Sequence, residues 1–238
     1  MPGLVPGIHV FRLDLMKSWM AGTQVFRKSA VFRTAMPGRD EKAQPMPTPK
    51  ILVLPGSNRT GSHNVRLGAL AAKELTLRDV DVTRISLVDY PLPIYEADID
   101  ARSGQPENAV KLKRMIQAHH GVFIASPEYS ASVTPLLKNA IDWVSRVREK
   151  GDPTYAAFKH RVFAIASAST GQHGGLRSLM ALRQILELGC GAFVIPEQVA
   201  VPWADTAFDE IDNLSDGRLL NLLRAQFDRL VETARLMM

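Results

Sequence analysis

The residues with the clearest chemical potential form one loop near position 60. This loop, residues 56–62 (Gly-Ser-Asn-Arg-Thr-Gly-Ser), follows a short apolar run and precedes a helical pattern that begins near Asn64. The hydroxyls of Ser57 and Ser62, the guanidinium of Arg59 and the amide of Asn64 are all groups that bind anions. Free backbone N–H groups at the beginning of a helix favour a phosphate in the same place. The pattern predicts an anion-binding loop, and an ordinary Gly/Ser turn before a helix is the alternative.

The spacing within the loop narrows the kind of phosphate. Gly56 and Gly61 have the separation of the Walker A motif, but Ser62 stands where that motif needs a lysine. The dinucleotide fingerprint also fails, because Asn58 replaces its second glycine. The loop therefore favours a single terminal phosphate, such as that of flavin mononucleotide (FMN), over a triphosphate or a pyrophosphate.

Two later loops also carry residues suited to binding. In the loop 126–135, Tyr129 offers a flat packing surface, and the backbone amides around it can bond the polar edge of a ring. The loop 169–175 is rich in glycine, which permits close approach of a ligand to the backbone, and Gln172 can reach the edge of a ring. Each loop taken alone also fits a plain turn. Together the three predict one site for a flat molecule with a phosphate.

The helical pattern after the second loop carries Lys138, Asp142 and Trp143. We interpret Trp143 as a packing anchor, and Lys138 with Asp142 as an ordinary ion pair one helical turn apart. Direct ligand contact by Trp143 or Asp142 is the alternative.

These loops need a scaffold that brings them together. Apolar runs predict strands at 51–54, 80–87, 121–126, 161–168 and 193–201, and helical periodicity predicts helices at 65–77, 108–119, 135–148, 176–188 and 216–236. Such alternation is typical of a parallel sheet with helices on both faces. We predict an α/β, flavodoxin-like three-layer sandwich with strand order 2-1-3-4-5, which places all three loops at one edge of the sheet. The segment 88–105 is expected to be irregular.

Composition excludes several classes of protein. The chain has 238 residues and is 46% hydrophobic, enough for one sizeable core, and it has no apolar run of transmembrane length. Its single cysteine, Cys190, excludes an intramolecular disulfide, and we interpret it as a buried structural thiol. These features predict a cytoplasmic protein without a membrane partner.

The positive charge is concentrated at the N-terminus. Residues 1–45 carry a net charge of +4 out of +5 for the whole chain, so the rest is nearly neutral, and a nucleic-acid partner is not expected. We predict two parts, a basic extension over 1–48 and one domain over 49–238. The extension has three interpretations: an upstream extension or mobile arm, an arm that packs on a neighbouring subunit, or a transit-type or signal segment. Met46 is an alternative start of the chain.

At these residues the chain resembles the NADPH-dependent FMN reductase family, a flavodoxin-like group of quinone, azo-dye and chromate reductases. The resemblance covers roughly residues 50–200. It rests on Gly56-Ser57-x-Arg59-x-x-Ser62-x-Asn64, on Pro127-Glu128-Tyr129, on the segment 138–143 (Lys-Asn-Ala-Ile-Asp-Trp) and on the Gly171–Gly175 loop.

The resemblance implies a set of residues around a bound FMN. The expected cofactor-binding residues are Ser57, Arg59, Ser62, His63 and Asn64 near the phosphate, Pro127, Glu128, Tyr129 and Ser130 along the flavin and ribityl chain, and Ser169, Gly171, Gln172, Gly174 and Gly175 beside the ring system. Many members have Asn where this chain has Ser130, so a side-chain bond by that Asn would be lost here. No catalytic side chain and no metal are expected.

The resemblance implies an oxidoreductase with a ping-pong mechanism. Electrons would pass from NADPH, with NADH as a second possibility, through FMN to quinone, azo, flavin or metal-oxyanion acceptors. The resemblance also implies a homodimer or homotetramer. Two alternatives stay open: a flavodoxin-type electron carrier that does not oxidise NADPH, and a non-flavin nucleotide-binding regulatory protein.

Overall fold

A computed structural model describes residues 47–238 of the chain. Its elements are the strands β1 (Lys50–Pro55), β2 (Asp81–Arg84), β3 (Gly121–Ala125), β4 (Val162–Ala168) and β5 (Phe193–Val201), and the helices α1 (His63–Thr76), α2 (Ala97–Ser103), α3 (Glu107–Gln117), α4 (Pro135–Arg146), α5 (Leu176–Gln184) and α6 (Gly217–Leu236), with a short 3₁₀ helix η2 (Leu87–Asp89) and a π-helical turn η3 (Ile185–Gly189). The predicted boundary at residue 48 stays a prediction, because residues 1–46 lie outside the described part.

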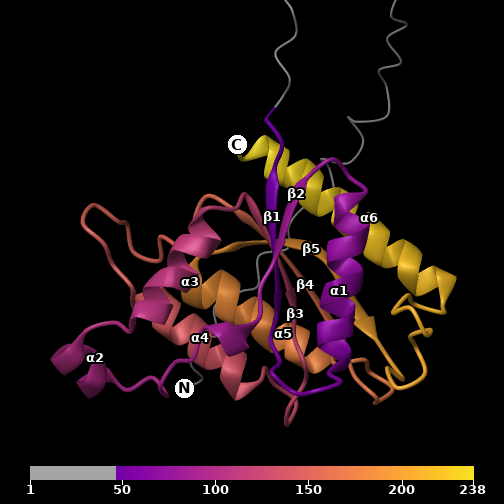
Figure 1. The fold of residues 1–238 in the computed structure, drawn as a ribbon, viewed down its shortest axis with the longest axis horizontal. Helices are drawn as coiled ribbons and strands as arrows, with labels where there is room; N and C mark the ends of the chain where they lie inside the picture. The colour runs from indigo at the N-terminus through magenta and orange to yellow at the C-terminus, as the bar shows by residue number, and fades with distance from the viewer. Residues whose placement is uncertain (1–46) are drawn as a thin grey trace, which may run out of the picture. The chain divides into compact units, whose positions relative to one another are not determined.

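The five strands form one parallel sheet in the order β2-β1-β3-β4-β5, which confirms the predicted fold class. Helices α1 and α6 pack on one face of the sheet, and α3, α4 and α5 pack on the other (Figure 1). Alternate residues of a strand therefore enter different core layers: Ile51 and Val53 face α1, whereas Leu52 and Leu54 face the opposite helices. All strands run downward in Figure 1, so their carboxyl ends lie at its lower edge.

Local sequence explains where two of the helices begin. Thr134 precedes α4 and its hydroxyl accepts a hydrogen bond from the N–H of Leu137 at 3.2 Å, while Pro135 occupies the first helical position. Asp216 precedes α6, and its carboxylate accepts from the N–H of Arg218 at 2.8 Å. Both residues satisfy N–H groups that have no partner inside the helix.

Three predicted elements differ from the structure. The strand expected over 80–87 pairs only along Asp81–Arg84, because Ser86 then caps the turn η2. The segment 88–105, expected to be irregular, contains the short helix α2. The helix expected over 176–188 is regular only to Gln184, after which the chain takes the wider turn η3.

The interpretation of Trp143, Cys190 and the ion pair in α4 is confirmed. Trp143 is fully buried, donates its indole N–H to the carbonyl oxygen of Pro93 at 2.7 Å, and meets Tyr95 edge to face. Lys138 and Asp142 form an ion pair with an N–O distance of 2.7 Å. Cys190 is buried, and burial raises the pKa of its thiol to about 11.

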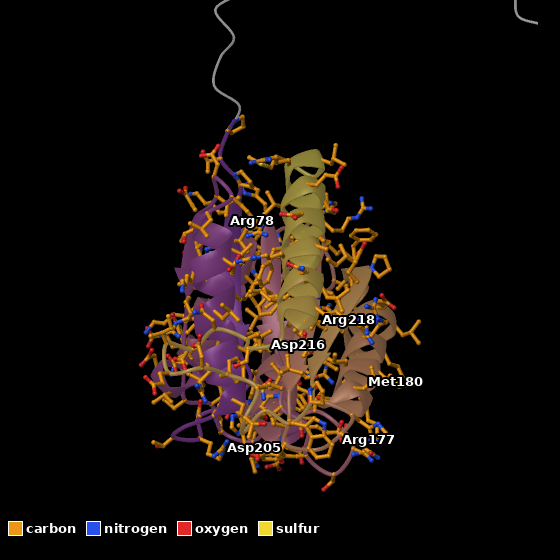
Figure 2. All side chains as sticks on the ribbon, turned by 90° about the vertical axis from the view of Figure 1, so that its right-hand side faces the viewer. Arg78, Arg177, Met180, Asp205, Asp216 and Arg218 are labelled. Carbon is orange, nitrogen blue, oxygen red and sulfur yellow. The ribbon has the colours of Figure 1, made fainter. Side chains whose placement is uncertain are left out.

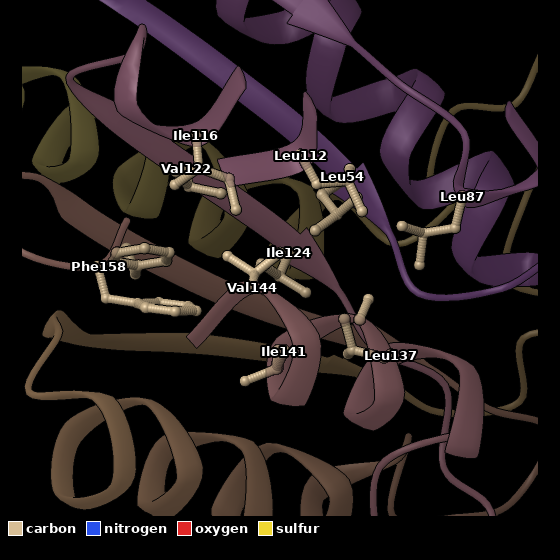
Figure 3. A pocket seen from close by; sticks show the side chains of 12 residues that line it. Leu54, Leu87, Leu112, Ile116, Val122, Ile124, Leu137, Ile141, Val144 and Phe158 are labelled. Carbon is tan, nitrogen blue, oxygen red and sulfur yellow. The ribbon is translucent and has the colours of Figure 1, made fainter. Parts of the chain in front are cut away.

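A small apolar cavity lies between the sheet and helices α3 and α4 (Figure 3). Its volume is about 20 Å³, and its walls are apolar side chains that include Leu112, Val144 and Phe158. A cavity of this size without polar partners stays dry, so it belongs to the core and is no ligand site. Among the described residues, no helix is both long and apolar enough to cross a membrane.

Candidate functional site

The loops after β1, β3 and β4 meet at the carboxyl edge of the sheet and enclose a cleft. The cleft has a volume of about 340 Å³, which lies within the usual range for small-molecule sites. Nine of the predicted site residues line it: Ser57, Arg59, Ser62, His63, Asn64, Pro127, Glu128, Tyr129 and Ser169. The other five, which are Ser130, Gly171, Gln172, Gly174 and Gly175, belong to the same loops but do not line the cleft.

The loop after β1 is held in a tight bend by its own backbone. The N–H of Gly56 donates to Ala125 of β3 at 2.8 Å, and the N–H of Ser62 donates back to Arg59 at 3.1 Å. Gly61 has a φ of +67°, a left-handed conformation that a side chain would strain. The bend brings the loop residues and the first turn of α1 to the same wall of the cleft.

Several polar groups of this wall are free to bind a ligand. The buried Ser62 precedes α1 without bonding its side chain to the helix, and the guanidinium of Arg59 makes only a 3.4 Å contact with the carbonyl oxygen of Gly61. The Nδ1 atom of His63 is buried and has no hydrogen-bond partner in the described part of the chain. Burial, followed by the charges of Arg59 and Arg66, lowers the pKa of His63. A positive field with unpartnered donors fits a phosphate.

Asn64 lines the cleft, and its side chain also has partners within the protein. Its side chain is buried and makes two bonds with Ala168 at the end of β4: the amide donates to the carbonyl oxygen at 2.8 Å, and the amide oxygen accepts the N–H at 3.0 Å. The side chain thus ties the beginning of α1 to the β4 loop. Its polar atoms are occupied, so its direct contact with a phosphate stays an untested prediction.

The loop after β3 forms a tight turn that projects Tyr129. The backbones of Tyr129 and Ser132 exchange hydrogen bonds of 3.0 and 2.9 Å, and the two central residues have left-handed φ values, +48° at Ser130 and +61° at Ala131. Left-handed backbone at a residue other than glycine is strained and recurs at functional sites. The Tyr129 side chain is 49% exposed, so its ring is available as a packing surface.

The loop after β4 depends on two glycines for structural reasons. Gly174 has a φ of +60°, and a Cβ there would lie 2.7 Å from the backbone of Val201 and Pro202. Gly175 has a φ of +86°, and a Cβ would lie 2.8 Å from the hydroxyl of Ser167. Close packing therefore explains why glycine occupies both positions. Gly171 and Gln172 are exposed at the rim.

Sequence reasoning missed Thr170, and it did not consider the exposed Trp203, which does not line the cleft. Thr170 lines the cleft beside Ser169. Trp203 follows β5, is 58% exposed, has a left-handed φ of +49°, and is followed by Ala204, whose N–H donates to Ser169. Trp203 could have been found from the rule that sites gather at the carboxyl ends of strands, because Val201 ends the last strand.

Comparison with known proteins agrees with this geometry. Residues 49–206 match the model of the NADPH-dependent FMN reductase family. An NAD(P)H-dependent FMN reductase of Pseudomonas aeruginosa is 32% identical over 182 residues, which are 76% of this chain and 92% of that protein. A quinone reductase of Escherichia coli is 35% identical over 141 residues, 58% of this chain and 69% of the relative.

A solved structure shows the same fold. FerB, a flavoenzyme NAD(P)H:(acceptor) oxidoreductase of Paracoccus denitrificans, superposes with a TM-score of 0.66 at 26% identity and covers 79% of this chain and 97% of its own. The family match extends over more than half of the chain and includes the strands, the loops and the cleft described above. The chain therefore belongs to the NADPH-dependent FMN reductase family and is an oxidoreductase.

Proposed function

We propose that the cleft binds FMN and that the enzyme passes electrons from NADPH to a small-molecule acceptor. When bound, FMN would supply the redox chemistry, accepting a hydride from the nicotinamide and returning electrons to the acceptor. The observation that carries the proposal is the group of uncommitted polar atoms at the beginning of α1: the Ser62 hydroxyl and the buried Nδ1 atom of His63, beside the guanidinium of Arg59, whose one contact is 3.4 Å long. This set matches a phosphate monoester and has no structural task in the described residues.

The chain's own residues divide the work of binding. Ser57, Arg59, Ser62 and His63 would hold the phosphate, and Tyr129 would pack against the flat part of the cofactor. Asn64 would act through Ala168, because its side chain joins the phosphate wall to the β4 loop. Ser169 and Thr170 would face the ring from the opposite loop. No side chain is needed as a general base, since the hydride moves between two cofactors.

The finer features of the activity are also proposals. Quinones, azo compounds, free flavins and metal oxyanions are the acceptor classes, and a ping-pong order follows if donor and acceptor use the same open cleft. NADPH is the proposed donor and NADH the second. A homodimer or homotetramer and a cytoplasmic location complete the proposal.

Titration and rapid mixing test this function directly. The full chain, purified and stripped of cofactor, is titrated with FMN and then mixed anaerobically with NADPH, and the reduced protein is mixed with a quinone. We expect one FMN per chain, loss of the visible flavin absorption with NADPH, and its return with the quinone. A chain that binds no FMN contradicts the proposal. A chain that binds FMN without oxidising NADPH is an electron carrier instead.

A further inference from the structure

Helix α5 begins without a capping residue of its own. Its first residue is Leu176, and the residue before it is Gly175, which has no side chain to accept a hydrogen bond. The first N–H groups of a helix have no partner inside the helix, so they need an acceptor from elsewhere. Helix α5 directly follows the β4 loop, which forms one wall of the cleft. The acceptor that caps α5 therefore also affects the position of this wall.

Glu128, fifty residues earlier in the loop after β3, supplies the acceptor. Its carboxylate accepts from the N–H of Arg177 at 3.1 Å and from the N–H of Ser178 at 3.3 Å. The other carboxylate oxygen pairs with the guanidinium of Arg177. The Glu128 side chain is only 8% exposed, whereas that of Arg177 is 59% exposed. A nearly buried negative charge at the positive end of a helix is well placed electrostatically.

Two buried serines join the same loop to the same helix. The hydroxyl of Ser178 donates to the carbonyl oxygen of Pro127 at 2.8 Å, and it lies 2.9 Å from the hydroxyl of Ser126. Both serines are fully buried. Three consecutive residues of the β3 loop, 126–128, are therefore bonded to two consecutive residues of α5, 177–178.

The position of this link decides what it controls. Tyr129, the residue after Glu128, presents its ring to the cleft, and Gly175, the residue before α5, ends the loop on the other side. Gly174 and Gly175 are fixed in turn, since the hydroxyl of Ser167 donates to Gly174 at 2.6 Å and packs against Gly175. Figure 2 shows Arg177 and Asp205 near the lower end of the molecule, where the strands end, and Arg78 near its upper end. The link thus spans the two loops between which a ring would lie.

Resting on the FMN site proposed above, we infer that Glu128 is a positioning residue. Its carboxylate holds the β3 loop against the beginning of α5 and so sets the separation between Tyr129 and the β4 loop. The same bonds occupy the free N–H groups of α5. The beginning of α5 is therefore no second anion site, and the phosphate is left to α1.

Glu128→Ala, Glu128→Gln and a matched control test this role. Glu187→Ala is the control because Glu187 also pairs with an arginine, Arg183, at 2.8 Å, but in η3 at the other end of the α5 segment. The first measurement uses the chain without FMN: amide hydrogen exchange at residues 176–179 should speed up in Glu128→Ala and stay unchanged in Glu187→Ala. The second measures FMN affinity and the visible circular dichroism of the bound flavin.

We expect Glu128→Ala to weaken FMN binding about tenfold or more, because it removes charge-assisted hydrogen bonds that hold the two loops together. It should also alter the visible circular dichroism of the bound flavin. Glu128→Gln keeps an oxygen that can accept both N–H groups, so it should return FMN affinity to within about threefold of the original. With FMN in excess, KM for NADPH should rise more in Glu128→Ala than kcat falls, because the loops that receive the substrate separate.

Three outcomes would overturn the role of Glu128. One is unchanged exchange at 176–179 in Glu128→Ala; another is unchanged FMN affinity and spectrum. The third is a variant that does not fold, which would show that the link supports the core instead of the cleft. If the original chain itself binds no FMN, the proposed function fails, and the hydrogen exchange of the apoprotein alone then decides whether the link exists.

Discussion

Replacing Ala131 by glycine should stabilise the protein, although glycine usually destabilises folded chains. Ala131 is the second central residue of the turn that projects Tyr129, and its φ is +61°. The residue is exposed, so removal of its methyl group costs little packing. The only large contribution that changes in the folded state is the crowding between Cβ and the backbone in the left-handed conformation, which glycine lacks.

The size of the effect is the difference between two terms. A left-handed conformation costs a residue with Cβ roughly 1–2 kcal/mol, which Ala131→Gly recovers. Glycine makes the unfolded chain more disordered, which costs about 0.4–1 kcal/mol. The net gain in the free energy of unfolding is therefore about 0.8 kcal/mol, the middle of a range of roughly 0–1.6 kcal/mol. For a domain of this size the melting temperature should rise by about 2–4 °C per kcal/mol.

Ala225→Gly is the matched control. Ala225 is also an exposed alanine, but it lies inside α6, where glycine should lower the free energy of unfolding by about 1 kcal/mol. Both variants and the original chain are unfolded in urea without FMN, so that cofactor binding does not contribute. Midpoints are compared at equal slope. The two glycine variants should move in opposite directions.

Ser130→Asn extends the same reasoning to the neighbouring residue. Ser130 has a φ of +48°, and asparagine tolerates left-handed backbone better than serine. This variant should stabilise the folded protein by a few tenths of a kcal/mol. If Ala131→Gly destabilises as much as Ala225→Gly, the backbone of the turn is not strained, and the reasoning is wrong.

Three further predictions concern the site and the core. Arg59→Ala and Ser62→Ala should each weaken FMN binding, by about tenfold to a hundredfold for Arg59, whereas equal affinities by titration would place the phosphate elsewhere. Hydrogen bonds from Arg114, and then from Lys113, lower the pKa of Glu149 from 4.5 to about 2, so the stability that they contribute is present above pH 4.5 and is lost toward pH 2. Acid unfolding of Lys113→Met should therefore depend less steeply on pH in that range, and an unchanged profile speaks against the assignment. Cys190, with a pKa raised to about 11, should react slowly with a thiol reagent in the native protein and rapidly in urea; equal rates mean that the thiol is accessible.

Local patterns in the sequence were sufficient for most of the fold. The apolar run of β3 predicted that strand to within a residue, because a strand buried on both faces has little room for polar side chains. The edge strand β5 was also predicted, from the apolar residues at its two ends, although its middle contains Pro196, Glu197 and Gln198. The other edge strand, β2, was the weakest case. Its pattern continues to Leu87, but only four residues pair, since Ser86 turns the chain into η2.

The sequence predicted which residues belong to the candidate site better than it predicted what each side chain contacts. Loop residues such as Ser57, Ser62 and Tyr129 could be gathered from the rule that sites form at the carboxyl ends of parallel strands. The motif alone gave no means to distinguish Ser62, whose side chain leaves α1 uncapped, from Asn64, whose side chain is bonded to Ala168. Partners 104 residues apart in the chain carry no local signal.

The sequence by itself determined the parallel sheet and the family, because each depends on residues that are close together in the chain, and it predicted an anion-binding loop after β1. Only the tertiary structure decided that Glu128 caps α5, that two glycines of the β4 loop are required by packing, and that the Nδ1 atom of His63 lies buried without a partner. Each of these facts depends on which distant backbone groups a side chain meets. That arrangement is set by the packing of the whole sheet and its helices, and short-range spacing does not contain it.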